Sequence, residues 1–325
     1  MAVDNKRIRI GVIGFGTIGK YVVDGALAHN EFEVVAIFDP SLLSVSAEFM
    51  SAEKYRHISL MASANELVAY QQVDLVYIAT PPATHIEYCR LALAQRKAIW
   101  CEKPLSVDLM AAKKLVEELE ASGLVSAVNL SLASSPILDK LVSLTMEEEH
   151  GAAQQVEMRF HYSEWPRHWQ VGAASWLSSR EQGGFLREVF SHFVFLQHRL
   201  FGEMKLTNCQ ISFAAGGCET YVMAQYLCGS LPVRVCGGIG GVAPDTNEWT
   251  LFTDRRAIRY SDWNKLSMGT QESWWDVDIG QVGSSVLLQL DEVAKMMRGK
   301  PHKLASFREA LAVQVVVEQT LNSSC

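Results

Sequence analysis

A glycine-rich turn near the N-terminus constrains the fold more than any other feature of this sequence. Residues 7–13 are rich in β-branched side chains, a helical pattern occupies residues 21–27, and three glycines separate the two. At a strand-to-helix turn, such glycines permit a tight bend, close backbone approach to a pyrophosphate, and close packing of helix on strand. The helix N-terminus also offers N–H groups to phosphate oxygens. The pattern therefore predicts a dinucleotide site at Gly14, Phe15, Gly16, Thr17, Ile18 and Gly19.

Asp39 stands where such a site needs a carboxylate. It follows a second predicted strand at residues 34–38 and lies twenty residues after Gly19. There it can accept hydrogen bonds from both hydroxyls of the adenosine ribose, and it would repel a 2′-phosphate. The segment Asp39-Pro40-Ser41 also has the composition of an ordinary turn. With the glycines upstream, we interpret Asp39 as a ribose ligand, which favours NAD and leaves NADP as the alternative.

Strands and helices continue to alternate through the first 130 residues. Helices are predicted at residues 85–95 and 107–122, the second with Ser106 as its N-cap. Further strands are predicted at residues 74–79, 97–100 and 125–130. Parallel strands joined by helices form a doubly wound sheet that binds ligands at the carboxyl ends of its strands. The sequence therefore predicts an α/β Rossmann domain over residues 1–130.

Length and charge limit the remaining possibilities. A chain of 325 residues is too long for one comfortable core, so residues 131–325 are expected to form a second domain. The formal net charge of −7 argues against a nucleic-acid partner and favours a small-molecule substrate. The apolar runs are too short or too interrupted to cross a bilayer, so no membrane partner is expected.

The N-terminus and the cysteines indicate the compartment. Residues 1–9 are polar and charged and lack the pattern of a secretory signal. Seven cysteines are scattered, odd in number, and never spaced as Cys-x-x-Cys. We expect reduced thiols in a cytoplasmic protein.

Four segments together resemble the Gfo/Idh/MocA oxidoreductase family. They are residues 14–19, the Thr-Pro-Pro-Ala-Thr-His run at 80–85, the Cys-Glu-Lys-Pro-Leu-Ser run at 101–106, and the Gly-Gly…His segment at 183–192. The first is common to dinucleotide folds, whereas the combination of a strand-end Glu-Lys-Pro with a later Gly-Gly…His is more specific. The resemblance implies a Rossmann domain followed by an α+β domain with an open, mostly antiparallel sheet.

The second half of the chain fits that expectation. Strands are predicted at residues 155–161, 206–213, 219–228, 233–237 and 248–260, and helices at residues 185–200, 284–297 and 307–321. The resemblance also implies a homodimer or homotetramer formed through the sheet of this substrate-binding and oligomerisation domain.

Lys103 is the leading catalytic candidate. In the family the lysine of Glu-Lys-Pro orients the substrate oxygen and shares its proton. A partly desolvated lysine beside an oxidised nicotinamide is expected to have a lowered pKa. The alternative is a solvated surface lysine.

His192 is the second catalytic candidate. It lies four residues after Glu188 on the predicted helix, so the two side chains share a face. Histidine suits acid–base work near neutral pH, and a nearby carboxylate orients it. The family places an aspartate where Glu188 stands and a glycine where Phe190 stands. The resemblance implies catalytic roles for His192 and Glu188, with Glu188 either touching substrate or supporting the site. Without the resemblance, His192 is a core histidine.

The resemblance assigns the remaining cofactor contacts. Glu102 is expected near the nicotinamide and Asn129 near its ribose, although the arginine usual after Asn129 is missing from this sequence. Thr80, Pro81, Pro82 and His85 are expected to shape the groove under the ribose and pyrophosphate, with His85 alternatively capping its helix. No metal site is predicted.

An aromatic and cationic run at residues 165–169 precedes the Gly-Gly segment. Such side chains stack on sugar rings or pair with carboxylates, and they also pack domains together. We predict substrate contacts at Lys103, Trp165, Arg167, Trp176 and His192.

These features predict an NAD(P)-dependent oxidoreductase that transfers a hydride between nicotinamide and a secondary alcohol or ketone of a sugar, cyclitol or related carbocyclic molecule. One alternative is NADP-dependent reduction of an imine or conjugated ring, but Pro40 and Ser41 supply no cation for a 2′-phosphate. Another is a non-catalytic dinucleotide sensor of the same fold. A sensor has no need of both Lys103 and His192.

Overall fold

The computed structural model describes residues 6–44, 52–280 and 283–323, which form two compact units. The first unit comprises Met1–Ser134 and Gly283–Leu311, and the second comprises Ser135–Val282 and Ala312–Cys325. This division differs from the expected single boundary at residue 130, because a later segment returns to the first unit.

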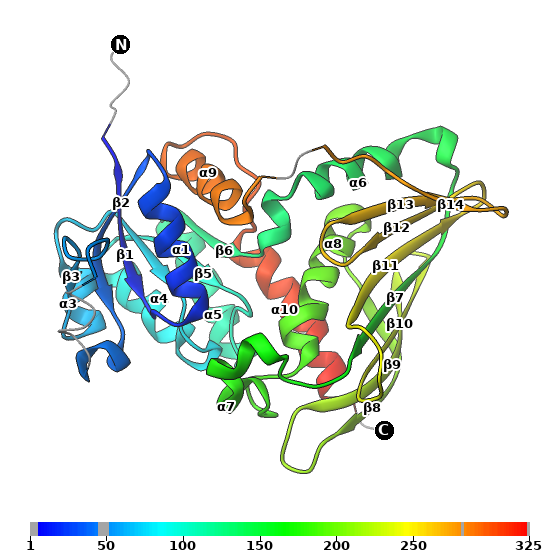
Figure 1. Ribbon diagram of the computed structural model, residues 1–325, viewed down its shortest axis with the longest axis horizontal. Coiled ribbons are helices and arrows are strands. Elements are labelled where there is room, and N and C mark those ends of the chain that lie inside the picture. Colours follow the sequence, from blue (N-terminus) through cyan, green and yellow to red (C-terminus); the bar gives the residue numbers. More distant parts are fainter. Residues whose placement is uncertain (1–5, 45–51, 281–282, 324–325) are drawn as a thin grey trace. The chain divides into compact units, whose positions relative to one another are not determined.

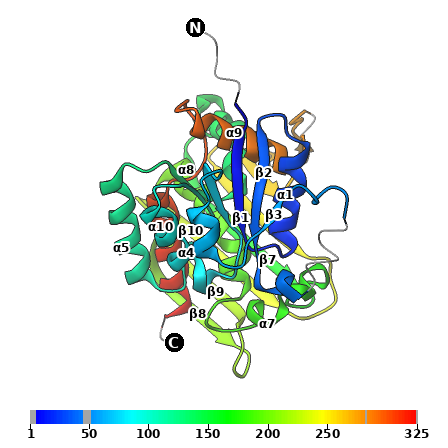
Figure 2. The same ribbon diagram turned by 90° about the vertical axis from the view of Figure 1, so that its left-hand side faces the viewer.

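A six-stranded parallel sheet forms the centre of the first unit (Figures 1 and 2). Its strands lie in the order β3-β2-β1-β4-β5-β6. Their bounds are β1 Ile8–Ile13, β2 Phe32–Phe38, β3 Ser59–Leu60, β4 Leu75–Ile78, β5 Ala98–Glu102 and β6 Ser126–Asn129. The helices are α1 Thr17–Ala28, α3 Ala64–Ala69, α4 His85–Ala94, α5 Leu109–Ser122 and α9 Ser285–Met297.

Helix α9 belongs to the first unit because it packs on α1. Val22, Ala26, Val286 and Leu290 are buried in one hydrophobic core with the inward side chains of the sheet. Gly25 permits the close approach, since a Cβ atom there would lie 2.7 Å from Val286 Cγ2. A predicted helix late in the sequence thus completes the first core.

The strand order places a topological switch point between β1 and β4. From β1 the chain proceeds to β2 and β3 on one side, and it then crosses to β4 on the other side of β1. In doubly wound sheets, ligands bind at the carboxyl ends of the strands at this point. The turns after β1 and β4 are the predicted segments 14–19 and 80–85.

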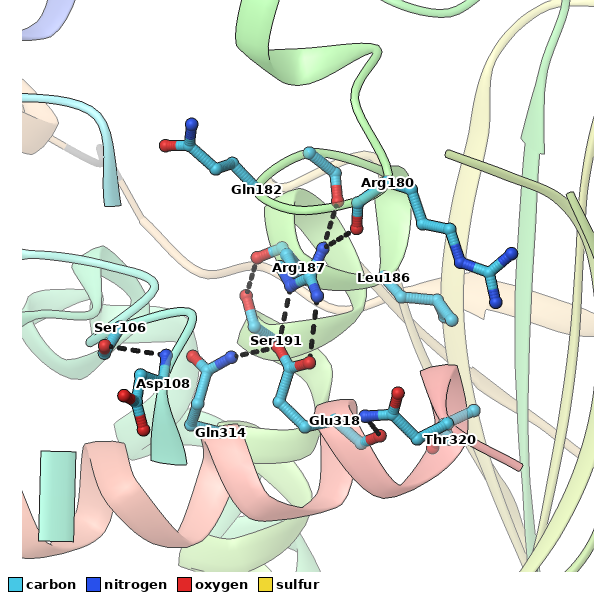
Figure 3. A network of polar contacts seen from close by, with 12 residues as sticks. Ser106, Asp108, Arg180, Gln182, Leu186, Arg187, Ser191, Gln314, Glu318 and Thr320 are labelled. Atoms are coloured by element: carbon cyan, nitrogen blue, oxygen red, sulfur yellow. Dashed lines mark hydrogen bonds and ion pairs between the residues drawn. The ribbon is translucent and has the colours of Figure 1, made fainter. Parts of the chain in front are cut away.

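The start of α5 corrects the expected N-cap at Ser106. Asp108 caps the helix, since its carboxylate accepts hydrogen bonds from Met110 N at 2.9 Å and Ala111 N at 3.0 Å. Ser106 bonds the capping residue and not the helix itself, because its Oγ accepts a hydrogen bond from Asp108 N at 3.0 Å (Figure 3). An ionised carboxylate is a stronger acceptor at a helix N-terminus than a hydroxyl.

An eight-stranded sheet dominates the second unit, in the order β14-β13-β12-β11-β7-β10-β9-β8 (Figure 1). Neighbouring strands are antiparallel except β7 and β10. The bounds are β7 Ala153–Tyr162, β8 Lys205–Phe213, β9 Glu219–Cys228, β10 Leu231–Ile239, β11 Thr246–Thr253, β12 Ala257–Ser261, β13 Lys265–Gly269 and β14 Trp274–Asp276. The expected fold class, an α/β Rossmann domain plus an α+β domain with an open, mostly antiparallel sheet, is confirmed.

Helices cover one face of this second sheet. They include α8 Ser191–Phe201 and α10 Phe307–Leu321, and α10 begins in the first unit. Helices α6 Pro136–Met146 and α7 Ala174–Leu177 also belong to the second unit. Trp249 of β11 donates to Gln197 of α8 at 3.0 Å, and Tyr226 of β9 bonds Thr320 of α10 at 2.7 Å. On the opposite face of β9, Met223 is 51% exposed.

Two predicted elements of the second unit are broken in the structure. The strand expected at residues 248–260 is the hairpin β11–β12, which turns at residues 254–256. The helix expected at residues 185–200 begins as a π-helix over Leu186–Phe190, here called the π-turn, and becomes α-helical at Ser191.

The described residues contain no helix with the length and apolar character to span a bilayer. Six cysteines lie in the described part of the chain, with no disulfide among them, and Cys325 lies outside it. Residues 1–5, which begin the segment compared with secretory signals, also lie outside it.

Candidate active site

The glycine turn has the backbone geometry predicted for a phosphate-binding loop. Gly14 has a φ of 98°, in the region that favours glycine, and a Cβ atom there would lie 2.6 Å from the Ala79 carbonyl oxygen. A Cβ atom at Gly19 would overlap the Gly14 carbonyl oxygen, so helix α1 can pack closely only with glycine there. A Cβ atom at Gly16 would meet nothing within 4 Å. The backbone at Gly16 is therefore open to an approaching group.

Asp39 is held across this turn. Its Oδ2 accepts a hydrogen bond from Phe15 N at 2.6 Å, and its Oδ1 accepts from Ser41 N at 2.8 Å and Ser41 Oγ at 2.7 Å. The carboxylate at the end of β2 is thus tied to the turn after β1. The contacts with Ser41 fit the ordinary-turn interpretation, and the ribose role of Asp39 stays a prediction.

His85 joins two of the predicted cofactor segments. The ring is buried, with Nε2 2.8 Å from the Thr80 carbonyl oxygen and Nδ1 2.9 Å from the Pro104 carbonyl oxygen. Burial lowers the pKa of His85, which favours the neutral ring with a single N–H to donate. Both ring nitrogens face carbonyl oxygens, which a helix cap would not do. With one N–H, the neutral ring donates to one of these two carbonyl oxygens, and it is buried between the turn after β4 and the turn after β5.

Glu102 is fixed by two neighbouring strands. Its Oε1 accepts hydrogen bonds from Tyr77 Oη of β4 at 2.5 Å and from Asn129 Nδ2 of β6 at 2.6 Å. Burial and the Glu102 charge raise the pKa of Tyr77 well above its usual value, so the hydroxyl stays protonated and donates. Lys103 follows directly and is half-buried at the carboxyl edge of the sheet. Residues from three strands, of which Glu102 and Asn129 were predicted, therefore meet at the Glu102 carboxylate.

Replacing Tyr77 by phenylalanine is expected to loosen this arrangement, because Glu102 loses the hydrogen bond from the Tyr77 hydroxyl. We expect the free energy of unfolding to fall by about 1 kcal/mol and the Kd for NADH to rise about fivefold. Urea unfolding and fluorescence titration measure the two effects. Tyr226→Phe, which removes a buried hydroxyl in the second unit, is the control and should lose stability alone. Unchanged NADH affinity in Tyr77→Phe would contradict a link between Glu102 and the cofactor.

Glu188 and His192 lie on the π-turn and at the start of α8. Ser191 N donates to the carbonyl oxygen of Leu186, five residues earlier, which is the hydrogen bond of a π-helix. The His192 ring is buried and meets the Trp263 ring edge to face, with centroids 5.3 Å apart. Single π-turns inside helices occur frequently at functional sites.

A buried glutamine connects Glu188 to Arg167. Gln170 Oε1 accepts from Arg167 Nε at 3.0 Å, and Gln170 Nε2 donates to Glu188 Oε1 at 3.2 Å. Arg167 Nη2 lies 4.0 Å from the same Glu188 oxygen. The guanidinium also lies over the Trp169 ring, 4.9 Å from its centroid. The predicted substrate residue Arg167 and the predicted catalytic residue Glu188 therefore belong to one cluster.

The two predicted tryptophans differ in their surroundings. Trp165 Nε1 donates to the Leu177 carbonyl oxygen at 3.1 Å, and its ring packs on Tyr162 and Phe185. These contacts support a packing role. Trp176 is half-buried on the short helix α7.

Three residues of the site were missed by sequence reasoning. Tyr77 reads as one apolar member of a buried strand, Gln170 as a loop residue, and Trp263 as one of several tryptophans in the second half. Their partners Glu102, Glu188 and His192 lie at least 18 residues away in sequence. Local patterns carry no signal for such pairs.

One side-chain group outside this site has metal-ligand chemistry. Ligand atoms of Glu147, Glu149 and His150 lie within 4.8 Å of one another. His150 Nε2 is already bonded to Glu147 Oε2 at 2.8 Å, and Glu149 is exposed. The predicted site residues are not part of this group.

Comparison with known proteins identifies the first unit. A family model described as an oxidoreductase family with an NAD-binding Rossmann fold matches residues 8–130. Residues 8–130 thus match the Gfo/Idh/MocA family model. The Gfo/Idh/MocA segment ends just after Asn129 and contains the glycine turn, Asp39, Glu102 and Lys103.

Curated relatives match this same part of the chain. An inositol 2-dehydrogenase from Acidothermus cellulolyticus is 33% identical over 130 residues, covering 38% of this chain and 35% of that protein. A 1,5-anhydro-D-fructose reductase from Ensifer adhaerens is 33% identical over 129 residues, covering 39% of this chain and 37% of that protein. The chain thus spans little more than a third of the length of these relatives.

Solved structures resemble nearly the whole chain in fold. UDP-N-acetylglucosamine 3-dehydrogenase from Acidithiobacillus ferrooxidans superposes with a TM-score of 0.77, covering 97% of this chain and 96% of that chain. Sequence identity is 18%, so this likeness concerns the fold alone.

Proposed function

We propose that this chain is an NAD(H)-dependent oxidoreductase that transfers a hydride between nicotinamide and a secondary alcohol or ketone of a sugar, cyclitol or related carbocyclic molecule. One observation carries the proposal. The glycine turn, the Asp39 carboxylate and the Glu102-Lys103 pair all lie at the carboxyl edge of one parallel sheet, in a Gfo/Idh/MocA segment.

The residues at this edge fit a dinucleotide. The open backbone at Gly16 and the N-terminus of α1 suit a pyrophosphate, and the Asp39 carboxylate suits ribose hydroxyls. Thr80, Pro81 and Pro82 follow β4 beside Gly14, and Thr84 Oγ1 donates to Thr80 Oγ1 at 2.7 Å. Glu102 and Asn129 would stand near the nicotinamide end. When bound, NAD supplies the two-electron acceptor for the hydride.

The protein's own task is to orient the substrate oxygen and move its proton. Lys103 offers three N–H donors to that oxygen and, when neutral, accepts the hydroxyl proton. His192 is the second proton acceptor, and Gln170 and Arg167 hold Glu188 in the same unit. Oxidation of the alcohol then releases one hydride and one proton, and the reverse reaction consumes both.

The substrate class rests on two supports. Curated relatives of the first unit are named for a cyclitol and for a sugar derivative. In the second unit, Arg167 and Trp176 offer a cation and a partly exposed ring, which suit hydroxyl and ring contacts. Trp165 is the weaker candidate, since its indole N–H is already bonded to Leu177.

Copies of the chain are proposed to associate through the uncovered face of the second sheet, as a homodimer or homotetramer. On β9, Met223 is 51% exposed and Leu227 is 41% exposed, while their neighbours Ala224 and Tyr226 are buried. Exposed apolar side chains in register on an open face are typical of a protein interface.

Titration with NADH and NADPH tests the proposal. We expect NADH to quench tryptophan fluorescence with the lower Kd, and Asp39→Ala to weaken NADH about tenfold while weakening NADPH less, because the carboxylate binds ribose hydroxyls and repels a 2′-phosphate. Asp291→Ala, an exposed carboxylate on α9, is the control and should bind NADH as the wild type does.

Each other outcome favours a different function. Tighter NADPH binding would favour NADP-dependent reduction of an imine or conjugated ring. Binding of NADH without oxidation of any polyol or reduction of any ketose would favour the non-catalytic sensor. Absence of binding to either cofactor at millimolar concentration would overturn the enzyme proposal.

A further inference from the structure

The π-turn of the second unit contributes Arg187 to a buried ion pair with Glu318. Arg187 is 6% exposed and Glu318 of α10 is 4% exposed. Arg187 Nε donates to Glu318 Oε1 at 2.6 Å, and Arg187 Nη2 donates to Glu318 Oε2 at 2.9 Å (Figure 3). This two-point contact fixes the plane of the guanidinium as well as its distance.

The same guanidinium holds the loop that enters the π-turn. Arg187 Nη1 donates to the carbonyl oxygens of Arg180 at 2.8 Å and Gly183 at 3.1 Å. Gln314 Nε2 donates to Glu318 Oε1 at 2.6 Å and so orients the carboxylate (Figure 3). One side chain therefore ties the Gly-Gly loop, the π-turn and helix α10 together.

A second buried carboxylate holds the first residue of the π-turn. Glu219 at the start of β9 is 1% exposed and accepts a hydrogen bond from Leu186 N at 2.6 Å. Gly184 lies against this carboxylate with a φ of 96°, and a Cβ atom there would overlap the Glu219 oxygens. The glycine is thus required by both its backbone conformation and its neighbour.

The end of the π-turn is also bonded. Ser191 Oγ donates to the Arg187 carbonyl oxygen at 2.8 Å (Figure 3), and Ser191 N donates to the Leu186 carbonyl oxygen. His192 follows at the next position. These contacts together hold the π-helical hydrogen-bond register from Leu186 to Ser191, and Ser191 is the residue before His192.

The register decides where His192 points. A π-turn contains one residue more than the α-helical turn it replaces, and one residue of an α-helix corresponds to a rotation of about 100°. If residues 186–190 relaxed to α-helical hydrogen bonding, α8 would turn relative to the Gly-Gly loop by about that angle. The His192 and Glu188 side chains would then no longer keep their present directions.

Stability alone does not require this ion pair. Apolar side chains of similar volume often replace a buried ion pair without loss of stability, and a well-attested use of buried charges is to select one arrangement among several. We propose that Arg187, Glu318 and Glu219 are positioning residues that hold the π-turn and thereby orient His192. The catalytic consequence rests on the function proposed above for His192.

The test removes both charges of the pair at once. The double variant Arg187→Met/Glu318→Gln leaves neither member of the pair as a buried unpaired charge, so it is expected to fold. In protein with ¹⁵N-labelled histidine, the pH midpoint of the His192 ring signals should move by about 0.5 or more, because the ring takes a new environment. The kcat for hydride transfer should fall about tenfold or more, with the KM for NADH unchanged.

Two further variants complete the test. Arg187→Lys keeps the buried charge but not the planar two-point contact, so it should move the His192 signals in the same way. Arg9→Met/Asp74→Asn removes a comparable two-point ion pair of the first unit and should leave the His192 signals unchanged. A folded Arg187→Met/Glu318→Gln protein with the wild-type His192 titration would overturn the proposal.

The nuclear magnetic resonance readout needs no substrate, so it separates the two proposals. Moved His192 signals support the positioning role even if the wild-type protein transfers no hydride, in which case the proposed function fails alone. Unmoved signals in a folded, active double variant overturn the positioning role and leave the proposed function intact.

Discussion

Replacement of Lys103 by methionine is expected to lower the kcat for hydride transfer by about 10³-fold, with the Kd for NADH changed by less than about threefold. Methionine retains most of the side-chain length but offers no donor to the substrate oxygen and no site for its proton. The Glu102 anchor next to it, which Tyr77 and Asn129 hold, is unaffected by the change. Steady-state rates and NADH titration measure the two effects.

Lys97 provides the matched control because it precedes the same strand that Lys103 follows. Its Nζ donates to the carbonyl oxygens of Val73 at 2.7 Å and Tyr70 at 3.2 Å, at the amino edge of the sheet. Lys97→Met should therefore lose stability while retaining kcat. Wild-type kcat in Lys103→Met would show that Lys103 is a surface lysine without a catalytic role.

The second large effect is expected for Glu219→Gln. Burial raises the pKa of Glu219 from 4.5 to about 7, while the N–H of Leu186 and the charge of Arg187 oppose the rise and the Glu318 charge adds to it. A difference of this size corresponds to about 3 kcal/mol of unfolding free energy. Glutamine keeps an acceptor for Leu186 N and does not ionise.

The sign follows from proton binding. Between pH 4.5 and 7 the folded protein holds the Glu219 proton more tightly than the unfolded chain does, so wild-type stability falls as pH rises through this window. Below pH 4.5 Glu219 is protonated in both the folded and the unfolded state, so the loss of stability caused by its ionisation is absent. Compared with the wild type, Glu219→Gln should therefore gain about 3 kcal/mol between pH 4.5 and pH 8. Urea unfolding at several pH values measures this difference.

Glu292 of α9 is a control of opposite sign. Burial disfavours its charge, but hydrogen bonds from Lys295 and from Lys303 N outweigh burial and lower its pKa. Glu292→Gln should thus lose stability at pH 8 relative to pH 4. A Glu219→Gln protein whose stability follows the wild-type pH dependence would contradict ionisation of Glu219 near neutral pH.

Much of the first unit could be predicted from its sequence. The three glycines, the strand that ends at Asp39 and the alternation of strands with helices are local patterns, and the structure contains each of them. The second unit was less predictable. Hairpin β11–β12 reads as one strand because its short turn at residues 254–256 contains no glycine or proline. The segment 283–311 reads as part of the second domain because position along the chain does not reveal which core a helix joins.

The sequence by itself determined the conformations that steric fit within a few residues decides. Gly14 and Gly19 allow the turn after β1, and the strand and helix patterns define the elements around it. Only the tertiary structure decided which distant side chains meet. Arg187 and Glu318 are 131 residues apart, and Glu102 bonds residues 25 and 27 positions away. A polar side chain can satisfy its hydrogen bonds with many partners, so the packing of whole elements determines which one it meets.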